Sequence, residues 1–305
     1  MYSLITNDVE EISIVKHRMD SQTARLVSEK ALPKLIDLFS KYDVSSTFYF
    51  TGTFAKSFPK SVELVHNNGH EVGCHGYSHK VKHSFDVLSS KDQYIHLYKA
   101  KNILEQSAEK VTSFRAPALR INNTIPMVLE SLNFETDSSV CPQRFEGPLT
   151  FGWKKKLNWL TCSRNPYYMS RGNPFKSGNS KILEVPVSSA VFAYQGSTMR
   201  IAPQLFEILE NLMITESKKS YKPLNFLFHP IEIINEDYEG PIAHRGSSTI
   251  EKIFGDKLRH NLKIKNLGRN AFEGLARSLE KIRDHGFEFL TVKNYSEMWK
   301  KYKNE

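Results

Sequence analysis

Short apolar runs alternate with segments of helical periodicity along most of this 305-residue chain. About eight runs are predicted to be strands: residues 2–6, 47–50, 71–74, 113–115, 134–137, 182–187, 226–228 and 287–292. Residues 21–40, 62–66 and 94–104 carry apolar side chains at helical spacing instead. Strands that alternate with helices are typical of parallel βα units. We therefore predict an α/β fold built on about eight parallel strands.

One segment departs from this alternation. Residues 141–180 are rich in Asn, Gly, Pro and aromatic residues, among them Trp153, Trp159 and Tyr167. Loops of this length inside a compact domain are usually lids or binding loops, and the alternative is an insertion that packs on itself. The sequence leaves both interpretations open. We predict one catalytic domain over residues 1–305, with an inserted aromatic and basic loop at about 141–181.

Composition and charge narrow the class of protein. With 40% hydrophobic and 25% charged residues, the chain is long enough to build one large core. The net charge is +9, but the basic residues are spread out and not interleaved with stacking aromatics. Nucleic-acid binding is therefore not expected. The local runs at 154–156 and 300–303 suit a solvated face, an anionic membrane or a phosphate-bearing substrate.

Targeting signals and cysteines bear on the compartment. No apolar stretch reaches the roughly 18–20 residues that a transmembrane helix needs. The N-terminal residues lack a basic region followed by a long apolar run, so no signal peptide is predicted. Cys74, Cys141 and Cys162 are too few for a disulfide framework and suit a reducing compartment. We predict a cytoplasmic protein, either free or at the inner face of the membrane.

Candidate chemistry begins with two histidines that follow the predicted strand 71–74. His75 and His79 are four residues apart on a short polar turn and can direct both imidazoles to one point. A carboxylate from Asp8 or Glu10 would complete a three-ligand site for a divalent metal, with room for water. Three ligands and an open position are typical of hydrolytic sites. Two histidines at this spacing also occur by chance on surfaces, so the motif needs support from elsewhere in the chain.

That support comes from the ends of the other predicted strands. In parallel α/β folds, functional groups gather at the carboxyl ends of strands. These ends carry Asp8, the two histidines, Arg115, Asp137 and His229. We therefore expect these side chains to lie at one end of the fold.

The order of these motifs resembles the polysaccharide deacetylase family, also called NodB-homology or carbohydrate esterase family 4. The motifs are Asp8-Val9-Glu10, His75-Gly76-Tyr77-Ser78-His79, Arg115-Ala116-Pro117, Asp137-Ser138-Ser139 and Leu227-Phe228-His229-Pro230. The resemblance extends from about residue 6 to residue 292. It implies a distorted (β/α) barrel of about seven to eight parallel strands, the NodB-homology fold. It also implies metal-dependent hydrolysis of an N-acetyl, sometimes O-acetyl, group on a sugar.

The first motif of the family usually holds two adjacent aspartates, one a base and the other a metal ligand. In this chain Asp8 is followed by Val9 and then by Glu10, as in an Asp-x-Asp/Glu subgroup. Side chains two apart on a strand point the same way, so both acids can still reach one site. The resemblance implies Asp8 as the base and Glu10 as a ligand beside His75 and His79. The reverse assignment of the two acids stays open.

The remaining roles also come from the resemblance. Arg115 would pair with Asp8, His229 would act as the acid, and the backbone N–H of Ala118 would hold the oxyanion. Asp137 is either a site carboxylate or the cap of the turn that follows it.

A second departure from the family concerns the acid. The Asp-Trp motif, whose carboxylate tunes the acid histidine in the family, has no clear counterpart in this chain. Glu184 and Asp137 are the candidates for that role.

We predict a metal-dependent carbohydrate N-deacetylase that acts on an N-acetylated sugar or polysaccharide precursor of the cell envelope, free or carrier-linked. Two imidazoles and one carboxylate suit Zn²⁺, and Co²⁺, Ni²⁺ or Mn²⁺ can use the same ligands. One alternative keeps the fold and is an amidohydrolase that opens a small cyclic amide. The other is a non-catalytic carbohydrate-binding protein.

Overall fold

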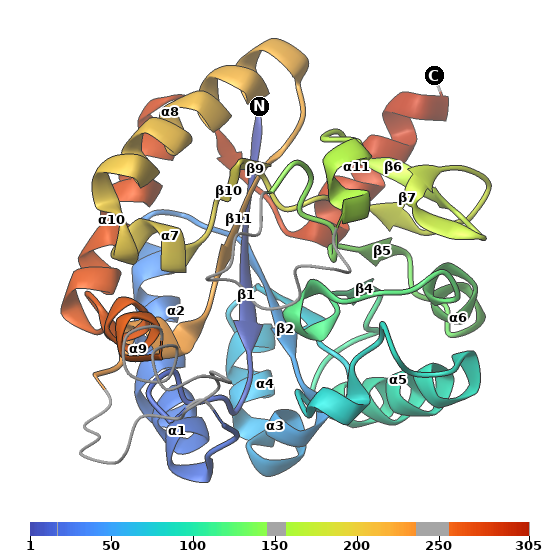
Figure 1. The fold of residues 1–305 in the computed structure, drawn as a ribbon, viewed down its shortest axis with the longest axis horizontal. Coiled ribbons are helices and arrows are strands. Elements are labelled where there is room, and N and C mark those ends of the chain that lie inside the picture. The colour runs from blue at the N-terminus through green and yellow to red at the C-terminus, as the bar shows by residue number, and fades with distance from the viewer. Residues whose placement is uncertain (17, 145–156, 236–255, 305) are drawn as a thin grey trace.

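The computed structural model describes residues 1–16, 18–144, 157–235 and 256–304 (Figure 1). Within these ranges the main sheet has ten strands in the order β11-β1-β2-β3-β4-β5-β8-β6-β7, and β12 also pairs with β1. The strands are β1 (Tyr2–Val9), β2 (Ser46–Phe50), β3 (Glu71–Cys74), β4 (Ser113–Phe114), β5 (Thr136–Asp137), β6 (Tyr167–Ser170), β7 (Asn173–Ser177), β8 (Leu183–Glu184), β11 (Leu224–Phe228) and β12 (Glu288–Phe289). A separate antiparallel pair is formed by β9 (Ser189–Ala190) and β10 (Phe192–Ala193).

Parallel pairing dominates the main sheet. β1 pairs in parallel with β2, β11 and β12, and the parallel pairing continues from β2 through β3, β4 and β5 to β8. Eight described strands are therefore parallel, and the β6–β7 hairpin extends the β8 edge in antiparallel pairing. The sheet curves into an open, distorted barrel (Figure 1). The predicted α/β barrel of about seven to eight parallel strands is confirmed.

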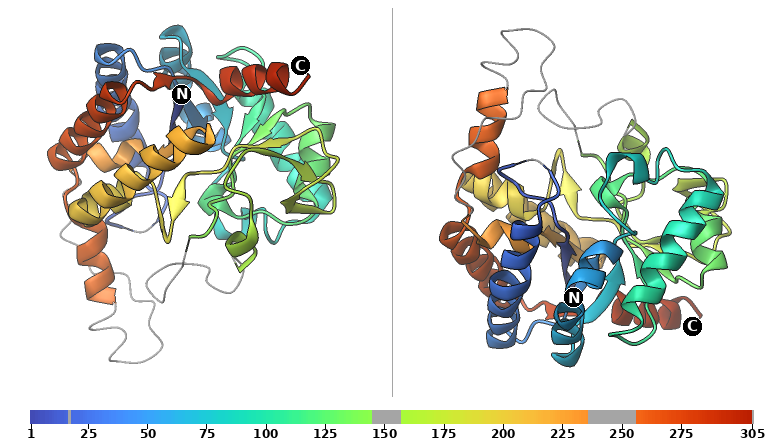
Figure 2. Two further views of the ribbon diagram at one scale, coloured as in Figure 1. Left: turned by 90° about the horizontal axis from the view of Figure 1, so that it is seen from above. Right: turned by 90° about the horizontal axis from the view of Figure 1, so that it is seen from below.

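Helices lie around the outside of this sheet, as both end views in Figure 2 show. They are α1 (Ser21–Leu26), α2 (Leu32–Lys41), α3 (Gly52–Ser57), α4 (Pro59–Asn67), α5 (Ser90–Leu104), α6 (Ile125–Ser131), α7 (Gly196–Ile201), α8 (Pro203–Ser220), α9 (Asp256–Ile264), α10 (Arg269–Asp284) and α11 (Val292–Asn304). A π-turn over Val27–Ala31 joins α1 to α2, so the predicted helix 21–40 is nearly continuous. Pro33 has no N–H, so it cannot donate the α-helical hydrogen bond to the carbonyl four residues before it. The wider π-helical turn before Pro33 leaves room for its ring.

The two faces of the sheet have different chemistry. On the outer face, Ile5 of β1 packs with Phe48 of β2 and Phe39 of α2 in the main hydrophobic core. On the inner face, Thr6 and Asp8 point into the barrel, where both accept hydrogen bonds from one buried arginine. Side chains alternate along a strand, so β1 supplies the core and the polar interior at once. The barrel interior is therefore where buried polar chemistry is concentrated.

The predicted inserted loop contributes to the core. Its described part holds a short 3₁₀ turn (Leu157–Thr161) and the β6–β7 hairpin. Trp159 is 1% exposed and Tyr167 is 4% exposed, and both pack in the main core. The Tyr167 hydroxyl donates to the Pro174 carbonyl at 2.8 Å. These two aromatics follow the interpretation of an insertion that packs on the domain, whereas Trp153 and residues 154–156 lie outside the described residues.

Two further findings concern the cysteines and the helices of the described residues. Cys74, Cys141 and Cys162 are all buried, and none of the three is in a disulfide. Among the helices of the described ranges, none has the length and apolar character needed to cross a membrane.

A matched pair of substitutions tests whether the insertion is part of the core. Trp159→Ala should lower the free energy of unfolding by about 3–5 kcal/mol, the usual cost of truncating a buried large aromatic. The neighbouring Leu160 is 50% exposed. Leu160→Ala should therefore change the stability by about 0.5 kcal/mol or less. Urea denaturation measures both values, and equal small losses would mean that Trp159 packs loosely.

Candidate metal centre

The candidate site lies where β1, β3 and β11 end. Asp8 is the second-to-last residue of β1 and Glu10 comes directly after this strand, while His75 comes directly after β3. The His75 N–H donates to the Phe50 carbonyl at 2.8 Å, which holds the start of the histidine loop against β2. His229 follows β11. Parallel pairing brings these carboxyl ends to one end of the barrel, as expected.

Glu10, His75 and His79 form a compact group of potential metal ligands. One ligand atom from each lies within 4.8 Å of the other two. Glu10 Oε2 is 3.1 Å from His79 Nε2 and 3.8 Å from His75 Nε2. Ligand atoms around a tetrahedral Zn²⁺ ion lie roughly 3.4 Å apart, given metal–ligand bonds near 2.1 Å. The three side chains therefore need only small adjustments to meet one ion.

The protonation of the two histidines suits ligation. His75 Nδ1 is 2.8 Å from the Arg115 carbonyl. A carbonyl can only accept, so Nδ1 carries the hydrogen and the lone pair of Nε2 faces Glu10. Burial lowers the pKa of His75, and it lowers the pKa of His79 to about 4. Both imidazoles are neutral at neutral pH, as metal ligands must be.

Glu10 also fits a cation. Burial raises the pKa of Glu10, and His229 and His75 oppose this shift only in part. Its Oε2 is buried and accepts no hydrogen bond. A buried carboxylate oxygen without a donor, set beside two imidazole lone pairs, is costly unless a positive ion lies between them. This donor set fits a divalent transition-metal ion.

Arg115 holds Asp8 in place from within the barrel. The guanidinium is fully buried, and its Nη1 lies 3.0 Å from Asp8 Oδ1. It also donates to the hydroxyl of Thr6 at 2.9 Å and to the carbonyl and hydroxyl of Ser138 at 2.9 and 2.7 Å. Its carbon Cζ lies 4.5 Å from the centre of the Tyr49 ring. All of these contacts fix the guanidinium, and therefore Asp8, in one position.

The electrostatics of Asp8 follow from this pairing. Burial alone would raise the pKa of Asp8, but Arg115 in particular, together with His75 and His229, lowers it below its ordinary value. The carboxylate is therefore ionised at neutral pH. Arg115 occupies Oδ1, while Oδ2 faces His75 Nε2 at 3.8 Å and His229 Nε2 at 4.0 Å.

The partner of His229 is the carboxylate of Glu232, which the sequence analysis missed. Nδ1 of His229 is 3.2 Å from Glu232 Oε1, and Glu232 Oε2 accepts from Arg200 Nε at 2.7 Å. Burial alone would lower the pKa of His229, but Glu232, Asp8 and Glu10 raise it to about 9. The signal was present in the sequence: Glu232 follows His229 by three residues on a 3₁₀ turn (Pro230–Ile233), where such residues share one side.

The two carboxylates that the sequence analysis suggested as partners of His229 lie elsewhere. Asp137 and Glu184 are neighbours across β5 and β8. Ser138 points into the barrel, so Asp137 before it faces the outer side of the sheet. Among the described hydrogen bonds, Asp137 accepts from Ser139 and Glu184 accepts from the Val140 N–H, and neither contacts His229. The structure therefore does not bring Asp137 to the site.

Ala118 lies on a turn beside the histidine loop. The 3₁₀ turn Pro117–Leu119 has left-handed backbone at Ala118 (φ 54°) and Leu119 (φ 53°). Ala118 is exposed. The turn is next to Gly76, because a Cβ added there would lie 3.5 Å from Pro117 Cδ. Gly76 itself has φ +69°, which favours glycine.

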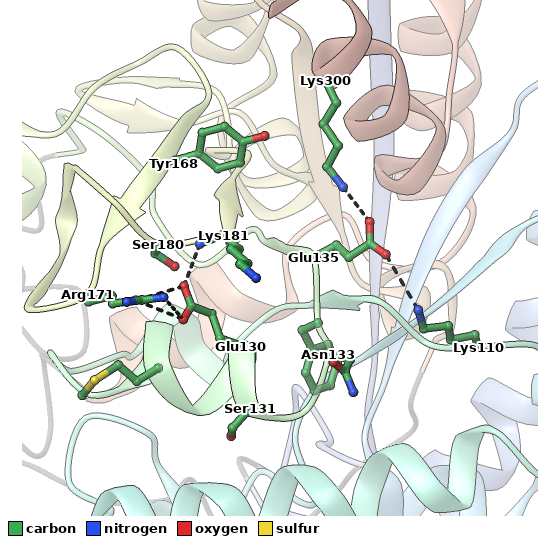
Figure 3. Close-up of a pocket in the computed structure, with 12 residues that line it drawn as sticks. Lys110, Glu130, Ser131, Asn133, Glu135, Tyr168, Arg171, Ser180, Lys181 and Lys300 are labelled. Atoms are coloured by element: carbon green, nitrogen blue, oxygen red, sulfur yellow. Dashed lines mark hydrogen bonds and ion pairs between the residues drawn. The ribbon is translucent and has the colours of Figure 1, made fainter. Parts of the chain in front are cut away.

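A separate surface cavity of about 810 Å³ lies near the amino ends of β4, β5 and β8, away from these groups (Figure 3). Its carboxylates are already paired with cations: Glu130 with Arg171 at 3.1 Å, and Glu135 with Lys300 at 2.6 Å and Lys110 at 4.0 Å. In parallel barrels this end supports stability, whereas the carboxyl ends carry catalysis.

Residues 20–136 match the family described as Polysaccharide deacetylase. The chain is 25% identical over 126 residues to the Peptidoglycan deacetylase of Helicobacter pylori, an alignment that covers 41% of this chain and 42% of that protein. It is 32% identical over 85 residues to the Peptidoglycan-N-acetylglucosamine deacetylase of Bacillus cereus, covering 28% and 30% of the two chains. The chain therefore spans less than half the length of these relatives.

A solved structure extends the likeness over the whole fold. The crystal structure of Puue allantoinase superposes with a TM-score of 0.64 and 15% identity, covering 98% of this chain and 89% of that chain. At this identity the superposition shows the fold alone. The sequence matches confirm the resemblance drawn from the five motifs: residues 20–136 are similar to the polysaccharide deacetylase family.

Substitution of the histidines tests the metal centre directly. His75→Ala or His79→Ala should weaken binding of Zn²⁺ by more than the roughly 10–100-fold cost of losing an outer partner of a ligand. Elemental analysis after metal removal and reloading measures the bound ion. His66→Ala, on α4, is the matched control and should bind as the unmodified protein does. Full metal content in both site variants would exclude these histidines as ligands.

Proposed function

We propose that this protein is a metal-dependent hydrolase that removes an N-acetyl group from an N-acetylated sugar or polysaccharide precursor. One observation carries the proposal: a carboxylate held ionised and a histidine held protonated flank three potential metal ligands. Asp8 is held ionised by a buried arginine, and His229 has its pKa raised to about 9. Titratable groups whose environments move their pKa values in opposite directions are typical of an acid and base pair.

Similarity to the polysaccharide deacetylase family supports the substrate class. Relatives that match part of the chain are named for deacetylation of peptidoglycan and of its N-acetylglucosamine units. We infer an N-acetylated hexosamine, free or linked to a carrier, that serves cell-envelope synthesis. Three buried cysteines outside any disulfide favour a reducing compartment, so we place this reaction in the cytoplasm.

Glu10, His75 and His79 would hold the ion. Zn²⁺ is the first choice for this donor set, with Co²⁺, Ni²⁺ or Mn²⁺ as alternatives. When bound, such an ion lowers the pKa of a water molecule and polarises a carbonyl group. Both effects are needed because an acetamide is a weak electrophile with a poor leaving group.

Asp8 would accept the proton of the attacking water. Arg115 occupies Oδ1, which leaves Oδ2 directed toward His75 and His229. Arg115 keeps this carboxylate ionised, so it is ready to act as a base at neutral pH. General-base catalysis of this kind contributes about 10²–10⁴-fold to the rate.

His229 would protonate the departing amine. Its Nδ1–H donates to Glu232, so the Nε2–H of the imidazolium faces Asp8 at 4.0 Å. The imidazolium persists at neutral pH because Glu232, Asp8 and Glu10 raise its pKa. The exposed Ala118 on the adjacent turn would supply a backbone N–H for the oxyanion.

Acetate release tests the proposal. Metal-loaded protein should release acetate from N-acetylglucosamine oligomers or carrier-linked N-acetylhexosamines, and Asp8→Asn is the inactive control. Ring opening of a cyclic ureide without acetate release would favour the amidohydrolase alternative, which the fold shared with an allantoinase motivates. Sugar binding with neither reaction would favour a carbohydrate-binding protein.

Two isosteric substitutions separate the base from the ligand. Asp8→Asn should keep the metal and lower turnover by about 10²–10⁴-fold, because it removes a proton acceptor. Glu10→Gln should weaken metal binding first, because it removes a negative ligand. Metal content and turnover are measured on the same samples. If Asp8→Asn empties the site while Glu10→Gln leaves it filled, the two roles are reversed.

Glu232→Gln tests the control of the acid. Removing this carboxylate destabilises the imidazolium, so the pKa of His229 should fall from about 9 toward its ordinary value of 6.5. His229 is active only below its pKa, so the alkaline limb of kcat/KM should move to lower pH. An NMR titration of His229 in metal-free protein gives the shift directly. Glu216→Gln removes a carboxylate paired with Arg164 and should leave both curves unchanged.

A further inference from the structure

Two buried carboxyl groups face each other on the outer side of the sheet. Asp137 ends β5 and Glu184 ends β8, and the parallel pairing sets them side by side. Both are fully buried. The groups around them include Cys162 and Tyr167, and Arg115 acts on them from the inner side while paired with Asp8. Two negative charges at this place would be severely destabilising.

Their hydrogen bonds leave one oxygen on each group without a donor. Ser139 donates to Asp137 Oδ1, and the Val140 N–H donates to Glu184 Oε1 at 3.0 Å. Asp137 Oδ2 and Glu184 Oε2 are buried and receive no hydrogen bond from any described donor. An ionised carboxylate can only accept, so two such oxygens cannot satisfy each other. The carboxyl groups lie within hydrogen-bonding reach, and one proton between them would satisfy both oxygens.

The segment after Asp137 connects this pair to the candidate site. The Ser139 hydroxyl accepts from the Ala116 N–H at 2.8 Å while it donates to Asp137. Ser138, which faces inward, accepts from Arg115 through its carbonyl and its hydroxyl. The same three residues, 138–140, therefore link the carboxyl pair to Arg115 and to the turn that begins after Ala116.

We propose that Asp137 and Glu184 share a proton and act as positioning residues, holding residues 138–140 so that Arg115 and the Ala118 turn stay in place. Neither carboxyl group touches the reacting atoms. The positioning of catalytic groups rests on the proposed function, whereas the shared proton does not. Asp137, which the sequence analysis offered as a site carboxylate, thus acts on the site from the opposite face of the sheet.

The shared proton makes stability depend on pH with a defined sign. Burial raises the pKa of both groups, and the charge of Asp137 raises that of Glu184 further. A carboxyl group with a raised folded-state pKa stabilises the protein below its unfolded pKa, and this contribution is lost as pH rises through the folded pKa. The folding equilibrium constant should therefore fall about tenfold per pH unit for each proton that only the folded state retains.

Glu184→Gln is the decisive variant. Its amide nitrogen can donate to Asp137 Oδ2 and its carbonyl can accept from the Val140 N–H, so the geometry is kept without a shared proton. The variant and the unmodified protein should have similar stability near pH 5. Near pH 8 the variant should have at least about a tenfold larger folding equilibrium constant, measured by urea denaturation. Asp137→Asn is the second variant and should behave in the same way.

Glu135→Gln is a control of opposite sign. Glu135 precedes β5, and hydrogen bonding to Lys300, shown in Figure 3, lowers its pKa. The ionised Glu135 carboxylate stabilises the folded protein above its unfolded pKa. Glu135→Gln removes this stabilisation, so the control should gain no stability near pH 8. If Glu184→Gln and Asp137→Asn both keep the pH dependence of the unmodified protein, no proton is shared and the proposal fails.

A further pair of readouts tests positioning. Glu184→Leu leaves the Val140 N–H without its acceptor and Asp137 Oδ2 without the shared proton, so hydrogen exchange of the Ala116 and Val140 amides should accelerate. Its kcat for acetate release should fall with little change in KM, and Glu184→Gln should restore both exchange and kcat. Unchanged exchange in Glu184→Leu would refute the link to the site. If the unmodified protein releases no acetate, the proposed function fails, while the exchange and stability results still decide the shared proton.

Discussion

The buried guanidinium of Arg115 is the constraint on which the site depends. A charge in the barrel interior is costly unless its donors are all used and its charge is balanced. Thr6, Asp8 and Ser138 accept its hydrogen bonds, and Tyr49 covers its face. These partners come from β1, β2 and the end of β5, so the register of the sheet and the position of Asp8 are fixed together. Moving β1 would leave the buried guanidinium without its counter-ion, and moving β2 or β5 would remove its ring contact or two of its hydrogen-bond acceptors.

A second buried arginine acts on His229, with the opposite effect on the pKa. Arg200 holds Glu232, and Glu232 holds His229, so a buried arginine fixes a carboxylate that stabilises an imidazolium. In the other pair the arginine acts on the carboxylate of Asp8 itself and keeps it ionised. A carboxylate between the cation and the functional group thus reverses the direction of the pKa shift.

Buried carboxyl groups in this protein differ in what balances their charge. Asp8 and Glu232 have arginines, and Glu10 has two imidazole lone pairs and a place for a cation. Asp137 and Glu184 accept hydrogen bonds from Ser139 and from the Val140 N–H, and Arg115 acts on them only from the inner side while paired with Asp8, so the proposed shared proton would neutralise one of them. The partner available to each carboxyl group, more than its degree of burial, decides its chemistry.

The sequence by itself determined the fold class and the end of the barrel at which the site lies, because strand periodicity and strand ends are local properties. The HxxxH spacing and the acids near β1 were also readable, since i, i+4 and i, i+2 relations depend only on local backbone geometry. The role of Asp137, the partner of His229 and the burial of Trp159 and Tyr167 were decided by tertiary structure. Side chains alternate between the two faces of the sheet, so Asp137 faces away from the site because Ser138 faces inward. A shift of the strand by one residue would turn Asp137 inward and Ser138 outward. Glu232 reaches His229 only because a 3₁₀ turn follows β11 and Arg200 of α7 fixes the carboxylate from across the fold. The i, i+3 spacing of His229 and Glu232 is local, but the Arg200 contact depends on packing between distant segments, which the order of residues along the chain does not specify.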